Sequence, residues 1–330
     1  MPLPRLFSSL TSRLGLRQPR PAILMYHRVA APVHDPWGLA VDPVHFERQL
    51  AYLIKHRTVL SMDDFIAHLQ LRILPSNAIA ITFDDGYLDN LLNAAPALTS
   101  HSAPATLFLP TGFVGQTRPF WWDELAAMIL ESTEQVSLEL IVDGESVRLA
   151  WPIAGPADIS GHWRAWEIPR TERQKSYLEI WRRLQRSSEA TRTHTMESLR
   201  NHLQASQDPL ARPMNADEIR VLLSNGLFTL GAHSISHPAL TTLSSEECRR
   251  EIVESVQQCR ALATRDVAGF AYPYGDMNSE VRADVATTGL SWACSTRTAF
   301  IEIEHNDLYA LPRIAVPDVS GPAFARLLRT

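Results

Sequence analysis

Short apolar runs recur along this chain, and each is followed by turn residues or by a segment with helical periodicity. Uninterrupted apolar runs of this length are typical of strands buried on both faces, as in a parallel sheet. Strands that alternate with helical segments of about 10 to 15 residues indicate βα units. About seven such runs favour a closed or nearly closed α/β barrel over an open doubly wound sheet. The runs are AILMYH (22–27), AIAITF (78–83), ATLFLP (105–110), LFTLGAH (227–233), VAGFAYP (267–273), LSWACS (290–295) and YALPRIAV (309–316).

The helical segments between the runs carry recognisable start signals. We expect Asp42 to cap the first long helix and Pro43 to occupy its first helical position. A second long helix is expected to begin at Ser244 or Ser245. No G-x-G-x-x-G motif follows any apolar run, so a dinucleotide-binding fold has no support. The apolar face of the first helix is expected to comprise Phe46, Leu50, Leu53 and Ile54.

Residues 116–216 interrupt the alternation of strands and helices. The segment FWWDELAAMILES (120–132) is expected to be helical. The segment VSLELIVDGESVRLAW (136–151) predicts a hairpin that turns at Asp143 and Gly144. Residues 160–212 are expected to form polar helices.

These patterns predict one barrel over residues 22–330, with a mostly helical insertion at about 116–216 and a basic N-terminal tail over 1–21. Over residues 160–200, nine Arg and Lys residues stand against five Glu, which gives this stretch a net charge of +4. The stretch is either a solvated helix face or a surface for an anionic polymer or partner.

The composition describes a globular protein that can build a full core, with 45% hydrophobic and 20% charged residues. The net charge of −5 gives no general attraction to nucleic acid or to an anionic membrane. Cys248, Cys259 and Cys294 are too few and too widely spaced for a disulfide framework or a zinc–thiolate site. We expect these cysteines to be free thiols, either buried or exposed, with no disulfide or metal-binding role. A reducing compartment fits this cysteine content best.

The N-terminal tail carries four arginines and no acid. It lacks the apolar core of a signal peptide, and no run of about 18 apolar residues occurs anywhere in the chain. Leucines near helical spacing make the tail either a short amphipathic helix in weak contact with a membrane surface, or a frayed end. We therefore expect a cytoplasmic protein, free or at the inner face of the membrane.

Ionisable residues gather where two of the predicted strands end. Asp84 and Asp85 follow the run 78–83, and two adjacent acids at the rim of an apolar interior require a positive partner. His233 and His237 lie four residues apart, so that a helical turn or tight loop aims both imidazoles at one point.

Two neutral imidazoles and one carboxylate form the open three-ligand site of a catalytic zinc ion, and cobalt or nickel also suits such a site. A divalent cation would relieve the repulsion between the two acids and leave one of them free to act as a base. Each motif alone is common, since Asp-Asp-Gly is often only a turn and His-x-x-x-His often accidental. Their joint occurrence at strand ends favours a metal site.

Three motifs in fixed order carry a family resemblance. TFDDG (82–86), HSISH (233–237) and FAYPYG (270–275) resemble the motifs of the polysaccharide deacetylases, the NodB-homology or carbohydrate esterase family 4 group. The resemblance extends over about 23–113 and 226–316, or 182 of the 330 residues. It implies an α/β fold, a distorted (β/α)7-type barrel. It also implies metal-dependent hydrolysis of a C–N bond, which removes N-acetyl groups from sugars without an organic cofactor.

The resemblance also implies residue roles. By position, Asp84 corresponds to the general base, and Asp85, His233 and His237 correspond to the metal ligands. The main-chain N–H of Tyr274 corresponds to a donor that binds the oxyanion.

Two departures from the family pattern concern the base and the acid. Many relatives have an Arg that orients the base where this chain has Ala271; Arg313 either replaces it or forms a salt bridge elsewhere. The late Leu-x-His segment that usually supplies the general acid is missing. The early pair Tyr26–His27 resembles the branch that acts on poly-N-acetylglucosamine-like exopolysaccharides, so His27 is the candidate acid, with a purely structural role as the alternative.

Three functions remain open from the sequence. The first is a metal-dependent N-deacetylase that acts on an N-acetylated sugar or polysaccharide, either an exopolysaccharide or a glycan precursor. The second is a metal-dependent amidase for a non-sugar amide, and the third is an inactive carbohydrate-binding relative. A carbohydrate is the expected partner and nucleic acid is not, whereas no oligomeric state follows from the sequence. Three aromatic residues either stack on sugar rings or pack in the core, namely Phe120, Trp121 and Trp122.

Overall fold

The structure is a computed structural model that describes residues 19–155, 163–205 and 208–329. Most of the predicted N-terminal tail, residues 1–18, lies outside the described residues. None of the helices in the described segments is long and apolar enough to cross a membrane.

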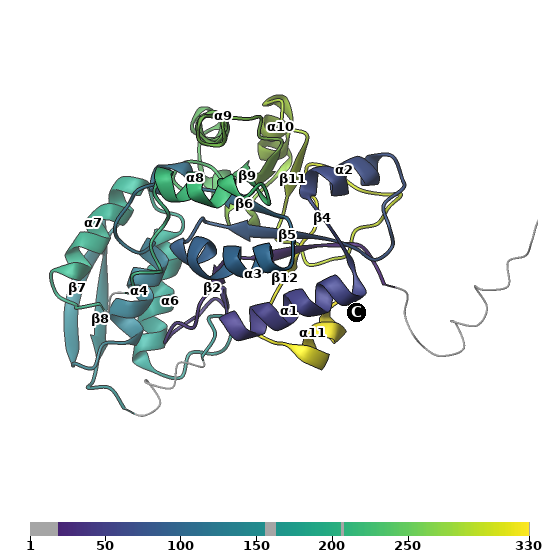
Figure 1. Ribbon diagram of the computed structural model, residues 1–330. Coiled ribbons are helices and arrows are strands. Elements are labelled where there is room, and N and C mark those ends of the chain that lie inside the picture. The colour runs from purple at the N-terminus through teal and green to yellow at the C-terminus, as the bar shows by residue number, and fades with distance from the viewer. Residues whose placement is uncertain (1–18, 156–162, 206–207, 330) are drawn as a thin grey trace, which may run out of the picture.

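A curled parallel sheet forms the centre of the molecule (Figure 1). All of its strand pairs are parallel, so the carboxyl ends of the strands meet at one edge. This arrangement confirms the predicted distorted (β/α)7-type barrel. The strands, in order across the sheet, are β11 (Trp292–Cys294), β10 (Gly269–Ala271), β9 (Phe228–Ala232), β6 (Ala105–Leu109), β5 (Ala78–Asp84), β1 (Ala22–Tyr26) and β12 (Ile314–Ala315), and β4 (Thr58–Leu60) also pairs with β5.

The two edges of the sheet are joined through residues 308–316. The N–H groups of Ala293 and Ser295, at β11, donate to the carbonyls of Leu308 and Leu311. The same segment then forms β12, which pairs with β1. The predicted strand over 309–316 is therefore regular only over two residues, because its first part turns around the rim of the barrel.

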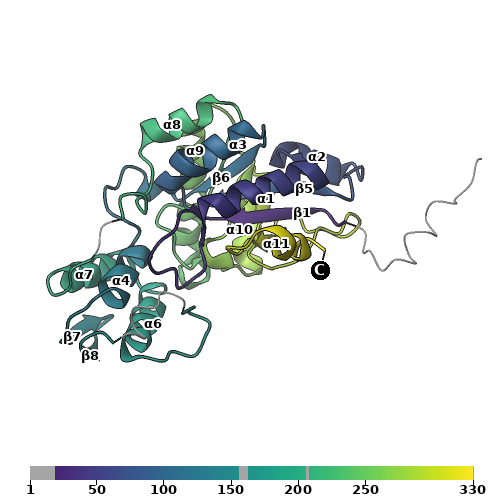
Figure 2. The ribbon, with the colours of Figure 1, turned by 60° about the horizontal axis from the view of Figure 1, so that its bottom comes forward.

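Helices cover the outside of the sheet (Figure 2). They are α1 (Pro43–His56), α2 (Met62–Gln70), α3 (Ala95–Ser100), α8 (Ala216–Ser224), α9 (Ser245–Ala263), α10 (Ser279–Thr287) and α11 (Gly321–Leu327), with a π-helical turn η2 (Asn90–Ala94) before α3 and short 3₁₀ turns η3 (Thr111–Phe113), η4 (Leu240–Thr242) and η5 (Pro273–Gly275).

The α1 helix begins as predicted and buries a slightly different face. The Asp42 side chain accepts hydrogen bonds from the N–H groups of Val44 and His45. Ile54 was expected on the buried face but is 44% exposed, whereas Gln49 is fully buried. Gln49 lies one turn from Phe46 and Leu53 on the same face, and it accepts a hydrogen bond from the Tyr26 hydroxyl.

Strand β5 explains why the chemistry sits inside the barrel. Its side chains alternate between two buried faces. Ala78 and Ala80 belong to the inner cluster with Phe108 and Trp292, whereas Ile79 packs outward under the helices. The same alternation turns Thr82 and Asp84 toward the interior, where the small alanines below leave room for a partner of Asp84.

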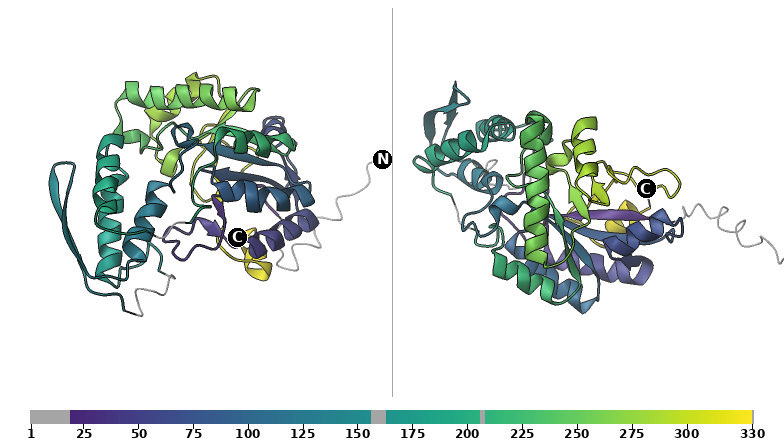
Figure 3. Two further views of the ribbon diagram at one scale, coloured as in Figure 1. Left: turned by 60° about the vertical axis from the view of Figure 1, so that its left-hand side comes forward. Right: turned by 90° about the horizontal axis from the view of Figure 1, so that it is seen from above.

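The segment between β6 and α8 forms a second lobe beside the barrel (Figure 3). Its elements are α4 (Trp121–Leu130), β7 (Val136–Val142), β8 (Glu145–Trp151), α6 (Glu172–Leu184) and α7 (Glu189–Arg200). We call these elements the inserted lobe. They pack around a core of their own, which is rich in tryptophan. The hairpin predicted at Asp143 and Gly144 is present as the antiparallel pair of β7 and β8.

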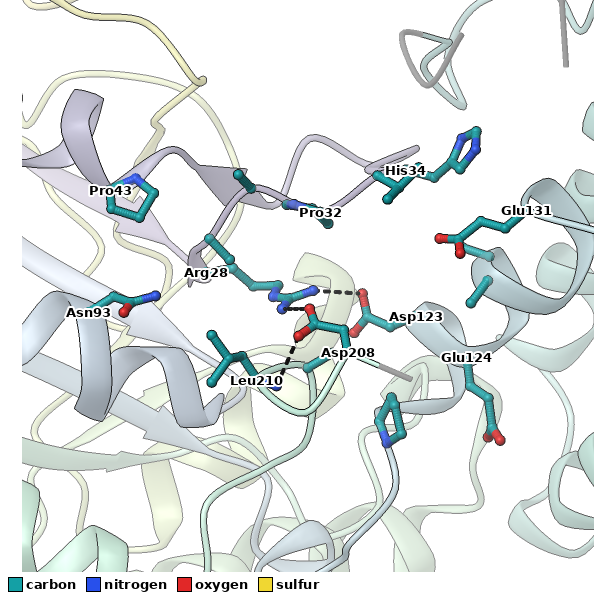
Figure 4. Close-up of a pocket in the computed structure, with 17 residues that line it drawn as sticks. Arg28, Pro32, His34, Pro43, Asn93, Asp123, Glu124, Glu131, Asp208 and Leu210 are labelled. Atoms are coloured by element: carbon teal, nitrogen blue, oxygen red, sulfur yellow. Dashed lines mark hydrogen bonds and ion pairs between the residues drawn. The ribbon is translucent and has the colours of Figure 1, made fainter. Parts of the chain in front are cut away.

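One arginine ties the inserted lobe to the barrel. Arg28, in the short strand β2 (Arg28–Val29) that pairs with β3 (Ala40–Val41), is 3% exposed. Its guanidinium lies 2.9 Å from the Asp89 carboxylate on the barrel side. It also lies 3.7 Å from Asp123 in α4 and 2.7 Å from Asp208, beyond α7 (Figure 4). The lobe is therefore anchored near its beginning and near its end by the same side chain.

Candidate metal centre

The candidate site lies where β5, β9 and β10 end. Four of its residues have positive φ angles, namely Asp85 (74°), Ser234 (64°), His237 (54°) and Tyr274 (59°). Non-glycine residues rarely adopt this conformation, and such strain concentrates at functional sites. Gly86, also at positive φ, lets the chain turn beside Leu109, whose Cδ1 a Cβ at this position would approach to 2.5 Å. The local backbone therefore holds the predicted residues in a defined arrangement.

Asp84 is paired with Arg313 inside the barrel. The two guanidinium nitrogens Nη1 and Nη2 each donate to one carboxylate oxygen of Asp84 at 2.7 Å, and the Arg313 side chain is fully buried. Burial alone would raise the pKa of Asp84, but the charge of Arg313, assisted by His233, holds that pKa below its usual value. Arg313 thus stands beside the predicted base, where the third motif offers only Ala271.

This pairing corrects one part of the charge argument from the sequence. A single cation was expected to relieve both acids. The structure instead gives Asp84 its own arginine, and leaves Asp85 as the acid that forms no ion pair with an arginine or lysine of the described residues.

Asp85, His233 and His237 converge on one point. The Asp85 Oδ1 atom lies 3.7 Å from His233 Nε2 and 3.5 Å from His237 Nε2. The ligand atoms of the three buried residues all lie within 4.8 Å of one another. Asp85 Oδ1 is buried without a hydrogen-bond partner, and burial together with the charge of Asp84 raises the pKa of Asp85 well above its usual value. An unpartnered, buried carboxylate oxygen facing two imidazole nitrogens fits a divalent metal ion.

The two histidines are prepared to act as ligands. His233 Nδ1 lies 2.7 Å from the carbonyl oxygen of Ala271, so this nitrogen carries the proton and Nε2 offers its lone pair. Burial lowers the pKa of His233, and burial together with the nearby His233 lowers the pKa of His237 well below its usual value. Both imidazoles are therefore neutral at pH 7, as metal ligation requires.

A buried glutamate holds the loop between these histidines. Glu251, in α9, accepts hydrogen bonds from the N–H groups of Ile235 (2.7 Å) and Ser236 (2.9 Å), and from the Ser236 hydroxyl (2.8 Å). The Ser234 hydroxyl also accepts the N–H of His237 at 3.1 Å. These bonds fix a loop that contains two positive-φ residues, so Glu251 positions the histidines without touching the candidate metal site itself.

His27 and Tyr274 line the same site. His27 Nε2 lies 3.9 Å from Asp84 Oδ2, and burial lowers the pKa of His27 to about 4. The Tyr274 ring packs 4.5 Å from the His237 ring, and its hydroxyl is buried without a partner. The structure thus brings all six predicted site residues together around one cavity.

The cavity over the site has a volume of about 580 Å³. Its walls include four tryptophans that the motifs do not contain, which are Trp37, Trp122, Trp166 and Trp181. Of the three aromatic residues considered from the sequence, all are buried in the core of the inserted lobe, and Trp122 is the one that also lines this cavity. Trp166 is 66% exposed at the cavity, and no sequence signal distinguishes it from an ordinary surface residue.

Comparisons with known proteins agree with this geometry. A family model described as polysaccharide deacetylase matches residues 72–137 and 201–293. The unmatched stretch between these segments contains most of β7 and all of β8, α6 and α7. No curated protein matches the sequence.

Three solved structures have the same fold. The deacetylase PplD of Streptococcus pyogenes, in complex with acetate, has a TM-score of 0.60 at 17% identity, over 95% of this chain and 99% of that chain. IcaB from Ammonifex degensii has a TM-score of 0.57 at 17% identity, over 96% and 99% of the two chains. A de-N-acetylase from Aggregatibacter actinomycetemcomitans has a TM-score of 0.57 at 12% identity, over 94% and 99%. At these identities, the likeness establishes the fold alone.

Proposed function

Because this chain belongs to the polysaccharide deacetylase family, we propose that it removes N-acetyl groups from an N-acetylated sugar by metal-dependent hydrolysis. The observation that carries this proposal is the unpartnered Oδ1 of Asp85, which faces two neutral histidines next to an acid with its own arginine. Asp85, His233 and His237 would hold the ion, and zinc suits two imidazoles and one carboxylate best. Such an ion supplies Lewis acidity, which activates water near pH 7 and polarises the amide carbonyl.

Asp84 acts as the general base. Its lowered pKa keeps it ionised at neutral pH, and the bidentate contact with Arg313 fixes the direction of its carboxylate. Asp84 accepts a proton from the water that attacks the amide carbon. Arg313 therefore has the positioning role that many relatives give to an arginine of the third motif.

His27 transfers the proton to the leaving amine. With its pKa lowered to about 4, His27 is neutral at pH 7 and must gain a proton before it can act as an acid. Asp84 Oδ2, at 3.9 Å, is the donor within reach once it has taken the proton of the attacking water. The amine then receives this proton as the C–N bond breaks, so that acetate and a free amino sugar are produced.

The main chain at Tyr274 stabilises the tetrahedral oxyanion. Pro273 precedes it and restricts the backbone, and the positive φ of Tyr274 turns the peptide away from the regular path. A fixed N–H donor of this kind contributes about 3 kcal/mol to catalysis.

The walls of the cavity support a carbohydrate substrate. Indole rings offer flat apolar faces on which sugar rings stack, and four of them surround the site. The early pair Tyr26–His27 favours a substrate of the poly-N-acetylglucosamine type, either an exopolysaccharide or its precursor.

The proposal is tested by acetate release from a panel of N-acetylated oligosaccharides, small cyclic amides and linear amides. We expect release from the sugars, loss of release after dialysis against a chelator, and recovery with zinc. Turnover of the non-sugar amides alone would support the amidase alternative. Sugar binding without acetate release in the zinc-loaded protein would support an inactive relative.

A further inference from the structure

A second cavity lies between α7 and the loop that carries the metal ligands. Its volume is about 280 Å³, and it shares no lining residue with the cavity over the metal centre. The chain reaches it from three directions: the turn after β6 at Gly112, the start of α4 at Trp121, and the loop at Ile235 and Ser236.

Arg192 is the buried cation of this cavity. It is 5% exposed, and its Nε atom is buried without a hydrogen-bond partner. Its Nη1 donates to the Ser236 carbonyl over a long 3.4 Å, and the guanidinium lies 5.6 Å from the Trp121 ring centre. Within the described part of the chain, no carboxylate forms an ion pair with Arg192. Burial of an unpaired guanidinium is costly, so a compensating anion is expected.

Three of the other charged side chains of the cavity are already paired with one another, namely Glu124, Arg118 and Arg200. Glu124, 5% exposed, binds Arg200 through both oxygens at 2.8 and 2.7 Å, and Arg118 at 3.2 Å. Glu189, on the first turn of α7, is exposed. The lining therefore holds three arginines and two glutamates, a surplus of one positive charge, and Arg192 is the buried cation among them that forms no ion pair with the described residues.

We propose that this cavity binds a small oxyanion of the phosphate class, with Arg192 as its principal ligand. A guanidinium presents parallel N–H donors in a plane, which suits phosphate oxygens. Arg118, whose side chain is 63% exposed, lies at the same cavity and adds a second cation. The volume suits one phosphate group and is below the usual range of about 300 to 1,000 Å³ for larger ligands. The phosphate is either a free ion or a group carried by a phosphorylated sugar.

The experiment titrates inorganic phosphate into the full-length chain by isothermal calorimetry, once with zinc bound and once in the presence of a chelator. We expect saturable one-site binding in the presence of the chelator, where the metal centre offers phosphate no second site, because the two cavities have no lining residue in common. Arg192→Gln should weaken binding about tenfold or more, since charge-assisted hydrogen bonds are lost. Arg182→Gln, an exposed position on α6 with the same change of charge, should bind like the wild type.

Absence of saturable binding to the wild type, or unchanged affinity in Arg192→Gln, would overturn the proposal. If Arg192→Gln does not fold, Arg118→Gln serves instead, with an expected weakening of about threefold at this exposed side chain. Displacement of phosphate by N-acetylglucosamine 1-phosphate identifies a sugar-borne group as the ligand, whereas retention of phosphate identifies the free ion. Because binding is measured without turnover, the result does not depend on the proposed deacetylase activity.

Discussion

The barrel rim and the inserted lobe contribute different chemistry to one cavity. The rim supplies buried charged and ionisable groups at strand ends, among them Asp84, Asp85 and Arg313. The lobe supplies aromatic surface, through Trp122 and Trp181. Reactive groups need a fixed geometry, and the ends of strands in a well-packed barrel provide it. Substrate recognition needs less precise positioning, so a lobe with its own core can supply it. The difference indicates that changes at the rim should affect turnover and stability, and that changes in the lobe should affect substrate affinity.

The largest effect is expected from Asp84→Asn. This change removes the proposed base, so kcat for acetate release should fall on the order of a thousandfold, while the three metal ligands stay in place. Zinc affinity, measured by competition with a chromophoric chelator, should change little. Asp63→Asn, an exposed acid in the first turn of α2, is the matched control. Retention of activity in Asp84→Asn would assign the base to another residue.

The contributions of two ion pairs to the free energy of unfolding distinguish the rim from the lobe. The pairs are Arg313–Asp84 in the rim and Arg200–Glu124 in the lobe. Arg313→Gln leaves the fully buried Asp84 without a cation, so the free energy of unfolding should drop by about 3 to 5 kcal/mol. Arg200→Gln in the lobe should cost about 1 to 2 kcal/mol, because its side chain is 26% exposed and Glu124 keeps Arg118. Urea denaturation of both variants provides the measurement. Equal losses would mean that the lobe is as tightly coupled to the fold as the rim.

The histidines of the rim predict a loss of stability in acid. Burial lowers the pKa of His27 to about 4, so between this value and about 6.5 the unfolded chain binds more protons than the folded one. The free energy of unfolding of the metal-free protein should therefore decrease as the pH falls through that window. His27→Gln should remove at most about 3 kcal/mol of this decrease. Urea denaturation at several pH values tests the slope, and an unchanged slope in the variant would contradict the assignment.

Glu251→Gln tests whether the loop between the two proposed metal ligands, His233 and His237, needs the support of this carboxylate. The glutamine keeps one oxygen for the two N–H groups but loses the negative charge that strengthens these bonds and the second oxygen that accepts the Ser236 hydroxyl, so zinc affinity should fall about tenfold. Glu254→Gln, an exposed position on the same helix, is the control and should bind zinc normally. Competition with a chromophoric chelator measures both. Normal zinc affinity in Glu251→Gln would show that the loop keeps its shape without this contact.

The smallest effect is expected from Trp166→Ala in the lobe. Loss of one stacking surface, worth about 1 kcal/mol, should raise KM roughly fivefold and leave kcat within about a factor of two. Thermal stability should be unchanged, because the side chain is 66% exposed. Ile168→Ala removes an even more exposed apolar side chain two residues away, and should leave KM unchanged. A fall in kcat with constant KM would instead give Trp166 a part in the chemistry.

The rim was predictable from the sequence because local patterns determine it. An apolar run that ends in Asp84 and Asp85 identifies a buried strand and its carboxyl end, and parallel strands bring such ends together. The four-residue spacing of His233 and His237 aims both rings at one point. Asp85 therefore lies next to His233 and His237 at the carboxyl ends of the strands, as the motifs indicated.

The partners of these residues were not predictable in the same way. Arg313 lies 229 residues from Asp84, and its sequence context allowed a salt bridge elsewhere equally well. Glu251 looks like any acid of a charged helix until the fold brings its buried carboxylate beneath Ser236. Trp166 and Trp181 belong to a segment without a recognisable motif. Contacts between distant segments depend on packing, and periodicity carries no information about them.

The anchoring of the lobe by Arg28 has an evolutionary consequence. Arg28 binds both Asp123 and Asp208, so the chain leaves the barrel for the inserted lobe and returns from it at the same place. A segment whose two ends lie close together can be lengthened, shortened or exchanged without moving the strands of the barrel. Homologues that retain Arg28 and its two carboxylates can therefore differ in the lobe, and so in substrate preference, while the residues of the barrel rim stay the same.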